Sequence, residues 1–405
     1  MWWRSLKDSR YRQRWSERLA FYPKNQFNHS KPVIVFHAVS VGELHAAVPL
    51  IRSCQEALPD WTFTLTTTTV TGSARVKEIF GNSVQHCYMP YDTPGSIRRF
   101  LRAVKPRMLV ILETELWPNL LFYSAQQHCQ LLLLNARLSD KSFLNYRKYA
   151  KLTSSMLLSF HCVAAQFEQD AEHFRFLGLP EKNLHVTGTM KFDQEIDQEQ
   201  QEAGLAMKKE LQRPILVAGS TREGEEQKVL QAFKILLAAL PELLLILVPR
   251  HPDRFDEVAK LLNKQAYKYV LRSSGEDVSI EKQILLGDSL GEMQFYFASA
   301  DVAFVGGSLV NTGCQNIIEP AALGLPVITG PSLFNFQAVS ELLLQASAML
   351  VVNDANELAE KALLLLQDKE RRKNMANVAR ATIKSNRGAT DRQKQLILQA
   401  IHSDQ

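Results

Sequence analysis

The sequence predicts an α/β protein with two domains, each built around a parallel sheet. The chain has 405 residues, more than a single hydrophobic core usually organises, so two domains are the default expectation. Short apolar runs alternate with longer segments of helical periodicity, and this series begins twice along the chain. We therefore expect two Rossmann-like domains facing a shared cleft, with ligands bound outside the carboxyl ends of the strands.

The first series of strands and helices occupies the N-terminal half. Short apolar runs there are typical of buried strands, and helical patterns fill the gaps between them. The expected strands are 33–36, 62–66, 108–112 and 131–134, and the expected helices are 43–56, 71–80, 93–105 and 116–127.

The second series begins after a polar stretch. The run from Gln194 to Glu202 has almost no core residues, which is typical of a linker or an exposed helix. The strands expected after it are 215–218, 243–248, 267–271, 284–286, 302–305, 327–328 and 349–352. We expect a first domain at 26–195 and a second at 196–405, with terminal helices that could pack back on the first domain.

The composition is ordinary for a soluble globular enzyme. Hydrophobic residues make up 46% and charged residues 22% of the chain, which argues against disorder. The five cysteines occur singly, with neither the paired spacing of a zinc site nor the density of a disulfide framework. A reducing compartment is expected.

The net charge is concentrated at the N-terminus. Residues 1–25 contain seven basic and two acidic residues, which accounts for the whole formal net charge of +5. Trp2, Trp3 and Trp15 are interleaved with these charges, and this combination suits the interfacial layer of an anionic membrane. The alternatives are nucleic acid, for which no binding motif is present, and a solvated first helix packed on the first domain.

No segment is expected to span a bilayer. The longest apolar stretch, 235–248, is interrupted by Pro241 and Glu242 and is shorter than the ~18 residues of a spanning helix. Trp2 and Trp3 are followed by charge rather than by the apolar run of a signal peptide. The expected location is the cytosol, with contact to a membrane surface.

A glycine-rich turn follows the expected strand at 302–305. Gly306 and Gly307 let the backbone come close to a ligand, and Glu319 with Pro320 opens a helix whose amides favour an anion. A carboxylate there can bind both hydroxyls of a ribose. This order suits a sugar nucleotide, although an ordinary strand-turn-helix of a parallel sheet reads the same way.

Polar residues follow other expected strands as well. Arg250 and the hydroxyl of Ser220 could meet the charge of a phosphate, together with helix amides. His251 could donate too, or could only cap the next helix. The turn at 287–293 offers backbone amides and a helix start to a base or a phosphate.

The first strand leads into a polar segment that ends at Glu43. Gly42 is expected to make the turn and Glu43 to stand at a helix start, where the helix dipole lowers the pKa of the carboxylate and keeps it ionised. Such a carboxylate is constantly available as a general base. The alternative is that Glu43 only complements the helix dipole.

Two acids follow the strand at 108–112. Glu113 and Glu115 are expected to point to the same side, as residues two apart do in a strand, and one could bind a sugar hydroxyl. Two unpaired buried acids would be costly, so at least one should pair with Lys191 or Arg137. A purely structural pairing is the alternative.

Metal chemistry and serine hydrolysis are poorly supported. No Asp-x-Asp occurs, and the ten histidines never take the spacing of a ligand pair. The Gly-x-Ser-x-Gly elbow of a hydrolase is also absent. No metal and no cofactor are expected.

Seven segments occur together in one order along the chain. They are Ser40-Val-Gly42-Glu43, Glu113-Thr-Glu115-Leu-Trp-Pro-Asn119, Asn135-Ala-Arg137-Leu-Ser139, Gly188-Thr-Met-Lys191-Phe-Asp193, Gly219-Ser-Thr-Arg-Glu-Gly224, Val248-Pro-Arg-His-Pro252 and Gly306-Gly-Ser-Leu. Together they resemble one family, the 3-deoxy-D-manno-octulosonic acid (Kdo) transferases of Gram-negative lipopolysaccharide biosynthesis, with the motifs in the family's order. The resemblance covers about residues 10 to 390.

The resemblance implies the two-domain glycosyltransferase architecture called GT-B. It also implies an inverting, metal-independent transfer of Kdo from CMP-Kdo to a lipid A precursor at the cytoplasmic face of the inner membrane. The first domain would bind the acceptor and the second the nucleotide sugar. The protein would be a peripheral membrane enzyme with an anionic membrane surface as a partner and no nucleic acid.

Roles carry over only to the matching positions. Glu43 resembles the family's general base. The residues placed on the acceptor side or in the cleft are Ser40, Gly42, Glu113, Glu115, Arg137 and Lys191. The residues placed on the donor side are Ser220, Thr221, Arg250, His251, Gly291, Glu292, Gly306, Gly307, Ser308, Asn316 and Glu319.

The chain departs from the family pattern in three places. Gly313-Cys-Gln-Asn316 stands where the family commonly has Gly-Gly-His-Asn, so an amide would take any role of that histidine. The segment Asp288-Ser-Leu-Gly-Glu292 replaces Asp-Thr-Met-Gly-Glu, and the basic aromatic segment stands where many members have a hydrophobic anchor. A GT-B enzyme using a UDP-sugar, a non-enzymatic nucleotide-binding peripheral membrane protein and an epimerase remain alternatives.

Overall fold

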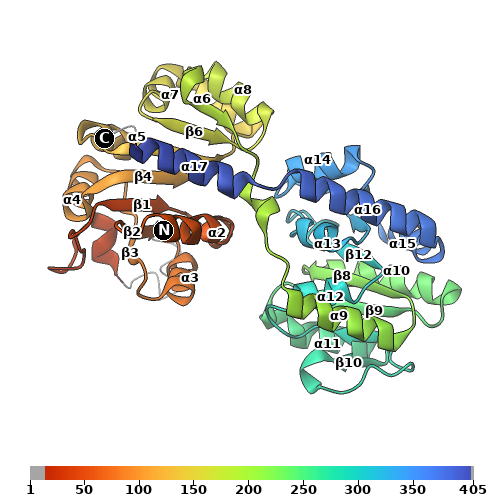
Figure 1. Cartoon of the computed structure of the whole chain (residues 1–405). Helices are drawn as coiled ribbons and strands as arrows, with labels where there is room; N and C mark the ends of the chain where they lie inside the picture. Colours follow the sequence, from red (N-terminus) through yellow and green to blue (C-terminus); the bar gives the residue numbers. More distant parts are fainter. Residues whose placement is uncertain (1–13, 403–405) are drawn as a thin grey trace. The chain divides into compact units, whose positions relative to one another are not determined.

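The computed structural model describes residues 14–402, and these form two α/β units (Figure 1). The first unit contains 14–193 and also 387–402, the end of the expected second domain. The second unit is Gln194–Asn386. Two Rossmann-like domains are thus confirmed, each with its own seven-stranded sheet in which every pairing is parallel.

The first sheet has the strand order β3-β2-β1-β4-β5-β6-β7. Its strands are β1 (Val33–His37), β2 (Thr62–Thr67), β3 (Gln85–Tyr88), β4 (Pro106–Leu112), β5 (Gln130–Ala136), β6 (Cys162–Ala165) and β7 (Leu184–Val186). The order reverses between β1 and β4, and crevices at such reversals are where ligands bind in open α/β sheets.

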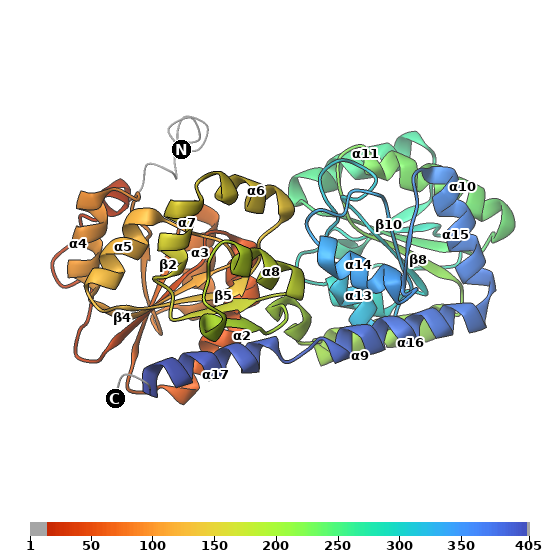
Figure 2. The same cartoon turned by 90° about the horizontal axis from the view of Figure 1, so that it is seen from above.

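Helices cover both faces of this sheet (Figure 2). One face packs on α4 (Pro94–Val104), α5 (Pro118–Gln126), α7 (Ala150–Leu157) and α8 (Glu168–Phe176), with α6 (Asp140–Lys148) beside α7. The other face packs on α2 (Val41–Ala57), α3 (Val70–Phe80) and α17 (Ala389–His402). Successive strand residues alternate between the two cores, as the period of a strand requires.

Helix α17 is held in the first unit by polar contacts as well as by its apolar face. The Asp193 carboxylate accepts hydrogen bonds of 2.6 Å from the amides of both Gly388 and Thr390. The Gln393 side chain accepts from the Asn135 amide at 3.1 Å. These bonds position the short helix η4 (Met190–Asp193), which carries Lys191.

The second sheet has the order β10-β11-β9-β8-β12-β13-β14. Its strands are β8 (Ile215–Thr221), β9 (Leu244–Pro249), β10 (Tyr269–Leu271), β11 (Ile284–Leu286), β12 (Val302–Val305), β13 (Val327–Thr329) and β14 (Met349–Val351). Its helices are α9 (Gln198–Leu211), α10 (Glu225–Ala239), α11 (Phe255–Lys264), α12 (Met293–Ala298), α13 (Ile318–Leu323), α14 (Gln337–Gln345), α15 (Ala355–Gln367) and α16 (Lys369–Ser385). The order reverses between β8 and β12.

All seven strands expected in the second half are confirmed, whereas three of the first sheet were not expected. Strand β3 begins with Gln85 and His86, and β6 consists largely of small residues, so neither reads as a strongly apolar run. Strand β7 is a three-residue edge strand. The polar run after Asp193 leads into the helix α9, which Asp197 caps.

Two basic residues of the expected N-terminal segment, Arg14 and Arg18, have partners within the first unit. The Arg18 side chain is only 2% exposed, and its guanidinium lies 4.2 Å from the centre of the Tyr88 ring. Arg14 is engaged by Glu17 at 2.6 Å. These two cations therefore stabilise the fold and are not free for an anionic surface, while Trp2, Trp3 and the basic residues before position 14 lie outside the described residues.

Within residues 14–402, no helix combines the length and hydropathy needed to cross a membrane.

Candidate active site

Glu43 lies in the first turn of α2, which follows the carboxyl end of β1. Ser40 is the N-cap of α2, and its hydroxyl accepts a hydrogen bond of 3.3 Å from the Glu43 amide. The Glu43 carboxylate accepts from the Val39 amide at 2.7 Å and from the Ser40 hydroxyl at 2.9 Å. These hydrogen bonds from the residues before α2 fix the direction of the carboxylate. Gly42 lies inside α2 rather than in the expected turn, which Ser40 makes instead.

The expected pKa of Glu43 was wrong in direction. Burial raises the pKa to about 7, and the nearby charges of Glu113 and Glu115 add to the increase against the hydrogen bonds from Val39 and Ser40. Burial therefore outweighs the hydrogen bonds that favour the ionised carboxylate. A carboxyl group with this pKa exchanges protons readily near neutral pH.

Glu113 and Glu115 lie in a turn after β4, so the strand spacing expected for them does not apply. Glu113 has a left-handed backbone with φ of 58°, a conformation that is uncommon outside glycine. Its carboxylate pairs with Lys191 at 3.7 Å, which is one of the two pairings expected from the sequence. Glu115 accepts a hydrogen bond of 2.7 Å from the indole of Trp117, and burial raises its pKa.

Arg137 follows β5 and adjoins this group through its backbone. Its carbonyl oxygen accepts a hydrogen bond from the Thr114 hydroxyl. Burial raises the pKa of Asp170, and the positive charge of Arg137 opposes this increase. We call Glu43, Glu113, Glu115 and Lys191 the acidic cluster. It lies where β1 and β4 end side by side, at the reversal of strand order.

A second group lies at the carboxyl ends of β8 and β9 in the second unit. Ser220 forms a β-bulge in β8 with φ of 57°, because Gly219 pairs with Val248 while Thr221 pairs with Pro249. Bulges of this kind re-aim side chains next to active sites. The Thr221 hydroxyl is fully buried and donates a hydrogen bond to Glu226 at 3.1 Å, so this hydroxyl is used within the fold.

Arg250 is exposed at the end of β9 and lies among polar groups from three segments. Its Nε donates to the Gln315 side chain at 3.2 Å, so the amide that replaces the family's histidine orients this arginine. Burial raises the pKa of Glu319, and hydrogen bonding from Asn316 and the charge of Arg250 oppose this. The Asn316 side chain also donates to Gln194 at 2.8 Å.

Arg222 and His251 complete this group. The Arg222 guanidinium donates a hydrogen bond to Nε2 of His251, so Nε2 is the acceptor in this bond. Desolvation and the charges of Arg222 and Arg250 lower the pKa of His251, so the imidazole is neutral. We call Arg222, Arg250, His251, Gln315 and Glu319 the C-terminal cluster.

The glycine loop after β12 is occupied by a carboxylate of the protein itself. Glu225 accepts hydrogen bonds from the amides of Gly307 at 2.6 Å, Ser308 at 3.0 Å and Leu309 at 2.8 Å. The Ser308 hydroxyl is buried and donates to the Val305 carbonyl. These groups are therefore used inside the loop rather than presented to a ligand.

Gly306 is required by packing. A β-carbon at this position would lie 2.6 Å from both the Ser220 carbonyl oxygen and the Thr221 α-carbon, which are backbone atoms that cannot give way easily. Gly291, by contrast, has φ of 83° and open space around it. Glu292, the next residue, is held by Arg272 at 2.7 Å.

Within the part of the chain that the structure describes, no group of three or more His, Cys, Asp or Glu side chains could hold a metal ion.

Comparison with known proteins identifies the family. Residues 13–194 match the family 3-Deoxy-D-manno-octulosonic-acid transferase (kdotransferase), and residues 181–382 match the glycosyl transferases group 1. A 3-deoxy-D-manno-octulosonic acid transferase of Haemophilus influenzae is 40% identical over 391 residues, covering 96% of this chain and 91% of the relative. The chain belongs to the Kdo transferase family. It is a glycosyltransferase enzyme, and the suspected resemblance is confirmed.

Another Kdo transferase supports the same family, and two solved structures share the fold. The Bordetella pertussis Kdo transferase is 39% identical, covering 88% of this chain and 84% of the relative. A glycosyltransferase of Rickettsia africae has a TM-score of 0.61 at 13% identity, covering 92% of this chain and 99% of that one. A Neisseria meningitidis UDP-GlcNAc 2-epimerase has a TM-score of 0.59 at 14% identity, covering 92% and 100%. These two likenesses concern the fold alone, which is the GT-B type.

In this Kdo transferase, the structure adds residues that the sequence reasoning had not selected. Arg222 and Gln315 lie inside the quoted motifs or their departures, and Glu225 directly follows one, so position in or beside a motif was an available signal. No sequence signal pointed to Arg272, because it contacts Glu292 from a short 3-10 helix 20 residues earlier in the chain.

Proposed function

We propose that this enzyme transfers Kdo from CMP-Kdo to a hydroxyl group of a lipid A precursor, in one displacement with inversion and without a metal ion. Family membership supports the Kdo transfer. The observation that carries the chemistry is Glu43, a firmly oriented carboxylate with a pKa of about 7 at the strand-order reversal of the first sheet. General bases work best when their pKa lies near the working pH.

Glu43 would accept the proton of the acceptor hydroxyl as its oxygen attacks the anomeric carbon of Kdo. The bond between that carbon and the phosphate oxygen breaks, and CMP leaves with the bonding electrons. Attack from the face opposite CMP inverts the anomeric configuration. Lys191, which neutralises Glu113, would keep the acidic cluster from accumulating three uncompensated charges.

The C-terminal cluster would hold CMP. Arg250 is exposed, charged and oriented by Gln315, so it suits the phosphate, whose negative charge grows as CMP leaves. Arg222 adds a second cation beside it. Glu319, close enough to Arg250 to be influenced by its charge, would accept the ribose hydroxyls. Two arginines could supply the countercharge that a metal ion supplies in other transferases.

The glycine loop takes a different part from the one expected. With its amides held by Glu225, the loop is preformed before any donor arrives. Such preorganisation reduces the entropy lost on binding. Gly306, Gly307 and Ser308 would thus shape the donor site through their backbone rather than bind the donor's charge.

A surface of the first unit suits the proposed membrane contact. It is formed by α6, α7 and the end of α8, and we call it the α6–α7 surface (Figure 2). Its exposed apolar side chains are Leu144, Tyr149, Leu152, Leu158 and Phe176, and its exposed cations are Lys141, Arg147, Lys148 and Lys151. Apolar groups beside cations match the chemistry of an anionic membrane interface, where the lipid acceptor would be found.

Product analysis tests the proposal. Purified enzyme is incubated with CMP-Kdo and a lipid A precursor, and the lipid is examined by mass spectrometry. We expect one or more Kdo additions, equal turnover after chelation with EDTA, and inverted anomeric configuration by NMR. CMP but not UDP should stabilise the protein in a thermal-shift assay. Hydrolysis of CMP-Kdo without a lipid product, or turnover with a UDP-sugar instead, would reject the proposed reaction.

A further inference from the structure

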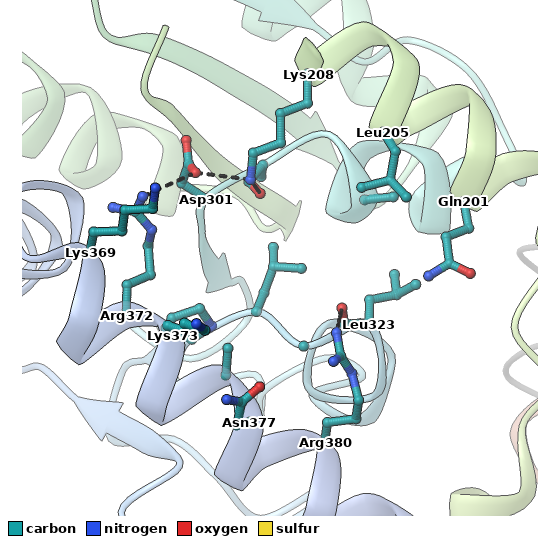
Figure 3. Close-up of a pocket in the computed structure, with 16 residues that line it drawn as sticks. Gln201, Leu205, Lys208, Asp301, Leu323, Lys369, Arg372, Lys373, Asn377 and Arg380 are labelled. Carbon is teal, nitrogen blue, oxygen red and sulfur yellow. Dashed lines mark hydrogen bonds and ion pairs between the residues drawn. The ribbon is translucent and has the colours of Figure 1, made fainter. Parts of the chain in front are cut away.

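A basic pocket lies in the second unit at the edge of the sheet opposite the C-terminal cluster. It has a volume of 440 Å³ and is lined by α9, the start of β12, the connection from α13 to β13 and one face of α16 (Figure 3). Asp301 in its wall directly precedes β12, whose other end leads to Gly306. The pocket is therefore separated from the donor-side residues by the length of a strand.

The lining of the pocket contains five cations and one acid. The cations are Lys208, Lys369, Arg372, Lys373 and Arg380, and Asp301 is the acid. Asp301 pairs with Lys208 at 2.9 Å and with Arg372 at 3.6 Å, so one carboxylate serves two cations (Figure 3). For Lys369 and Lys373 the structure gives no anionic partner within the described residues.

Three of these cations lie in the first turns of α16, where a helix disfavours positive charge. Lys369, Arg372 and Lys373 are close to the N-terminal end, where the acidic residues are the N-cap Asp368 and Glu370 in the first turn. The partial positive charge of a helix N-terminus makes nearby cations unfavourable. Asp368 and Glu370 offset part of this cost, and a bound anion would offset more of it.

The pocket is built to keep Arg380 in place. Arg380 donates to the Leu323 carbonyl at 3.1 Å, at the end of α13. Gly324 follows with φ of 77°, and a β-carbon there would lie 2.2 Å from the Arg380 guanidinium. A glycine at this position thus gives the guanidinium its room, and the remaining donors of the fork are available to a ligand.

We propose that this pocket binds a small anion bearing phosphate groups, at a site separate from the donor site. Four net positive charges match a ligand with two or more negative charges. The planar guanidinium of arginine and the compact ammonium group of lysine both donate hydrogen bonds to phosphate oxygens. The apolar walls of Leu205, Leu323 and Pro326 can contact a carbon group attached to the phosphate. The phosphate can belong to a soluble molecule or to a lipid headgroup.

Calorimetric titration of the full chain with inorganic pyrophosphate tests the site. We expect binding to the wild type that weakens with added salt, and an affinity about tenfold or more lower in Lys369→Gln/Lys373→Gln. Both lysines are exposed, so the fold should persist, and circular dichroism checks this. Arg371→Gln/Lys384→Gln is the matched control, because it removes the same charge from exposed positions of α16 outside the pocket.

A second variant separates this site from the donor site. Arg250→Gln should leave pyrophosphate binding at the pocket intact. If Arg250→Gln abolishes the binding and Lys369→Gln/Lys373→Gln does not, or if the matched control loses as much affinity as the pocket variant, the proposal is overturned. The proposed Kdo transfer is untouched by either result, because its own test is the lipid product.

Vesicles distinguish the two sources of the phosphate. Sedimentation is measured with phosphatidic acid vesicles and with phosphatidylcholine vesicles. Loss of phosphatidic acid binding in the pocket variant alone would assign the site to a lipid headgroup. Pyrophosphate binding that needs the pocket, together with vesicle binding that does not, would assign it to a soluble phosphate. Absence of pocket-dependent binding in both assays overturns the proposal.

Discussion

The Glu225 carboxylate lies 2.6 Å from the Gly307 amide nitrogen and accepts its hydrogen bond. The same carboxylate also accepts from Ser308, Leu309 and Arg222, so four backbone amides share one buried side chain. Amides after a strand in an α/β fold commonly meet a ligand's phosphate. Here the start of α10 provides the anion internally, which ties β8 and β12 together at the strand-order reversal.

Glu225→Ala is expected to disrupt the glycine loop. It leaves the amides of Gly307, Ser308 and Leu309 without their acceptor, and each buried unsatisfied group costs ~1–3 kcal/mol, with partial relief from entering water. We expect a loss of about 3 kcal/mol or more in the free energy of unfolding, measured with urea, and weaker CMP binding. Glu223→Ala in the connection from β8 to α10 is the control, since Glu223 is 92% exposed. Equal stability of the two variants would contradict this account.

Glu43→Gln is expected to lower turnover about 100-fold or more, because general bases contribute ~10²–10⁴. CMP binding, which the other unit would provide, should persist. In the wild type, the rate should fall as the pH drops below about 7, since Glu43 must be deprotonated to accept a proton. Steady-state kinetics from pH 5.5 to 8.5 measure both effects. A variant with near-normal turnover would remove Glu43 from the mechanism.

The raised pKa of Glu43 also predicts how stability depends on pH. The folded protein binds this proton up to a pKa of about 7, against 4.5 for the unperturbed group. The associated stability is full below pH 4.5 and is lost as the pH rises through 7, by up to about 3 kcal/mol. Glu43→Gln cannot titrate, so relative to the wild type it should gain ~1–3 kcal/mol between pH 4.5 and 8. Urea unfolding at both pH values tests this, and a constant difference would refute it.

Glu319→Ala should weaken CMP binding by ~1–3 kcal/mol, the scale of hydrogen bonds to a charged group. The reason is the proposed contact with the ribose hydroxyls, for which the nearby Arg250 helps to keep the carboxylate ionised. Calorimetry with CMP and with 2′-deoxy-CMP provides the measurement. The variant should discriminate less between the two nucleotides than the wild type, and unchanged affinity for CMP would exclude a ribose contact.

The α6–α7 surface predicts reversible attachment to anionic vesicles. Arg147→Gln/Lys151→Gln should weaken sedimentation with phosphatidylglycerol vesicles, since each basic residue near such a surface contributes ~1 kcal/mol, attenuated by salt. Lys260→Gln/Lys264→Gln on α11 removes the same charge from exposed positions elsewhere and should have little effect. Similar losses in both variants would mean that only the overall charge matters.

The sequence patterns predicted the architecture well because parallel strands buried on both faces are nearly continuous apolar runs. Strand β12, for example, is Val-Ala-Phe-Val with every residue buried. Prediction failed for β3, where Gln85 and His86 stand at the sheet edge and are only partly buried. The sequence also selected Arg250, which directly follows β9, and Glu43, which lies in the first turn of the helix after β1. The carboxyl ends of parallel strands lie at one edge of a sheet, where ligands bind.

The sequence could not predict the features that depend on contacts between segments far apart in the chain. The alternation of strands and helices, the motif order and the family follow from local patterns, since short-range periodicity reflects which side chains are buried. The pKa of Glu43 depends on Glu113 and Glu115, which follow another strand, and the hydrogen bond of the Gly307 amide depends on Glu225, 82 residues away. Burial, charge and hydrogen bonding depend on which groups lie close together in space. Only the tertiary structure therefore decided the raised pKa of Glu43 and the hydrogen-bond acceptor of the glycine-loop amides.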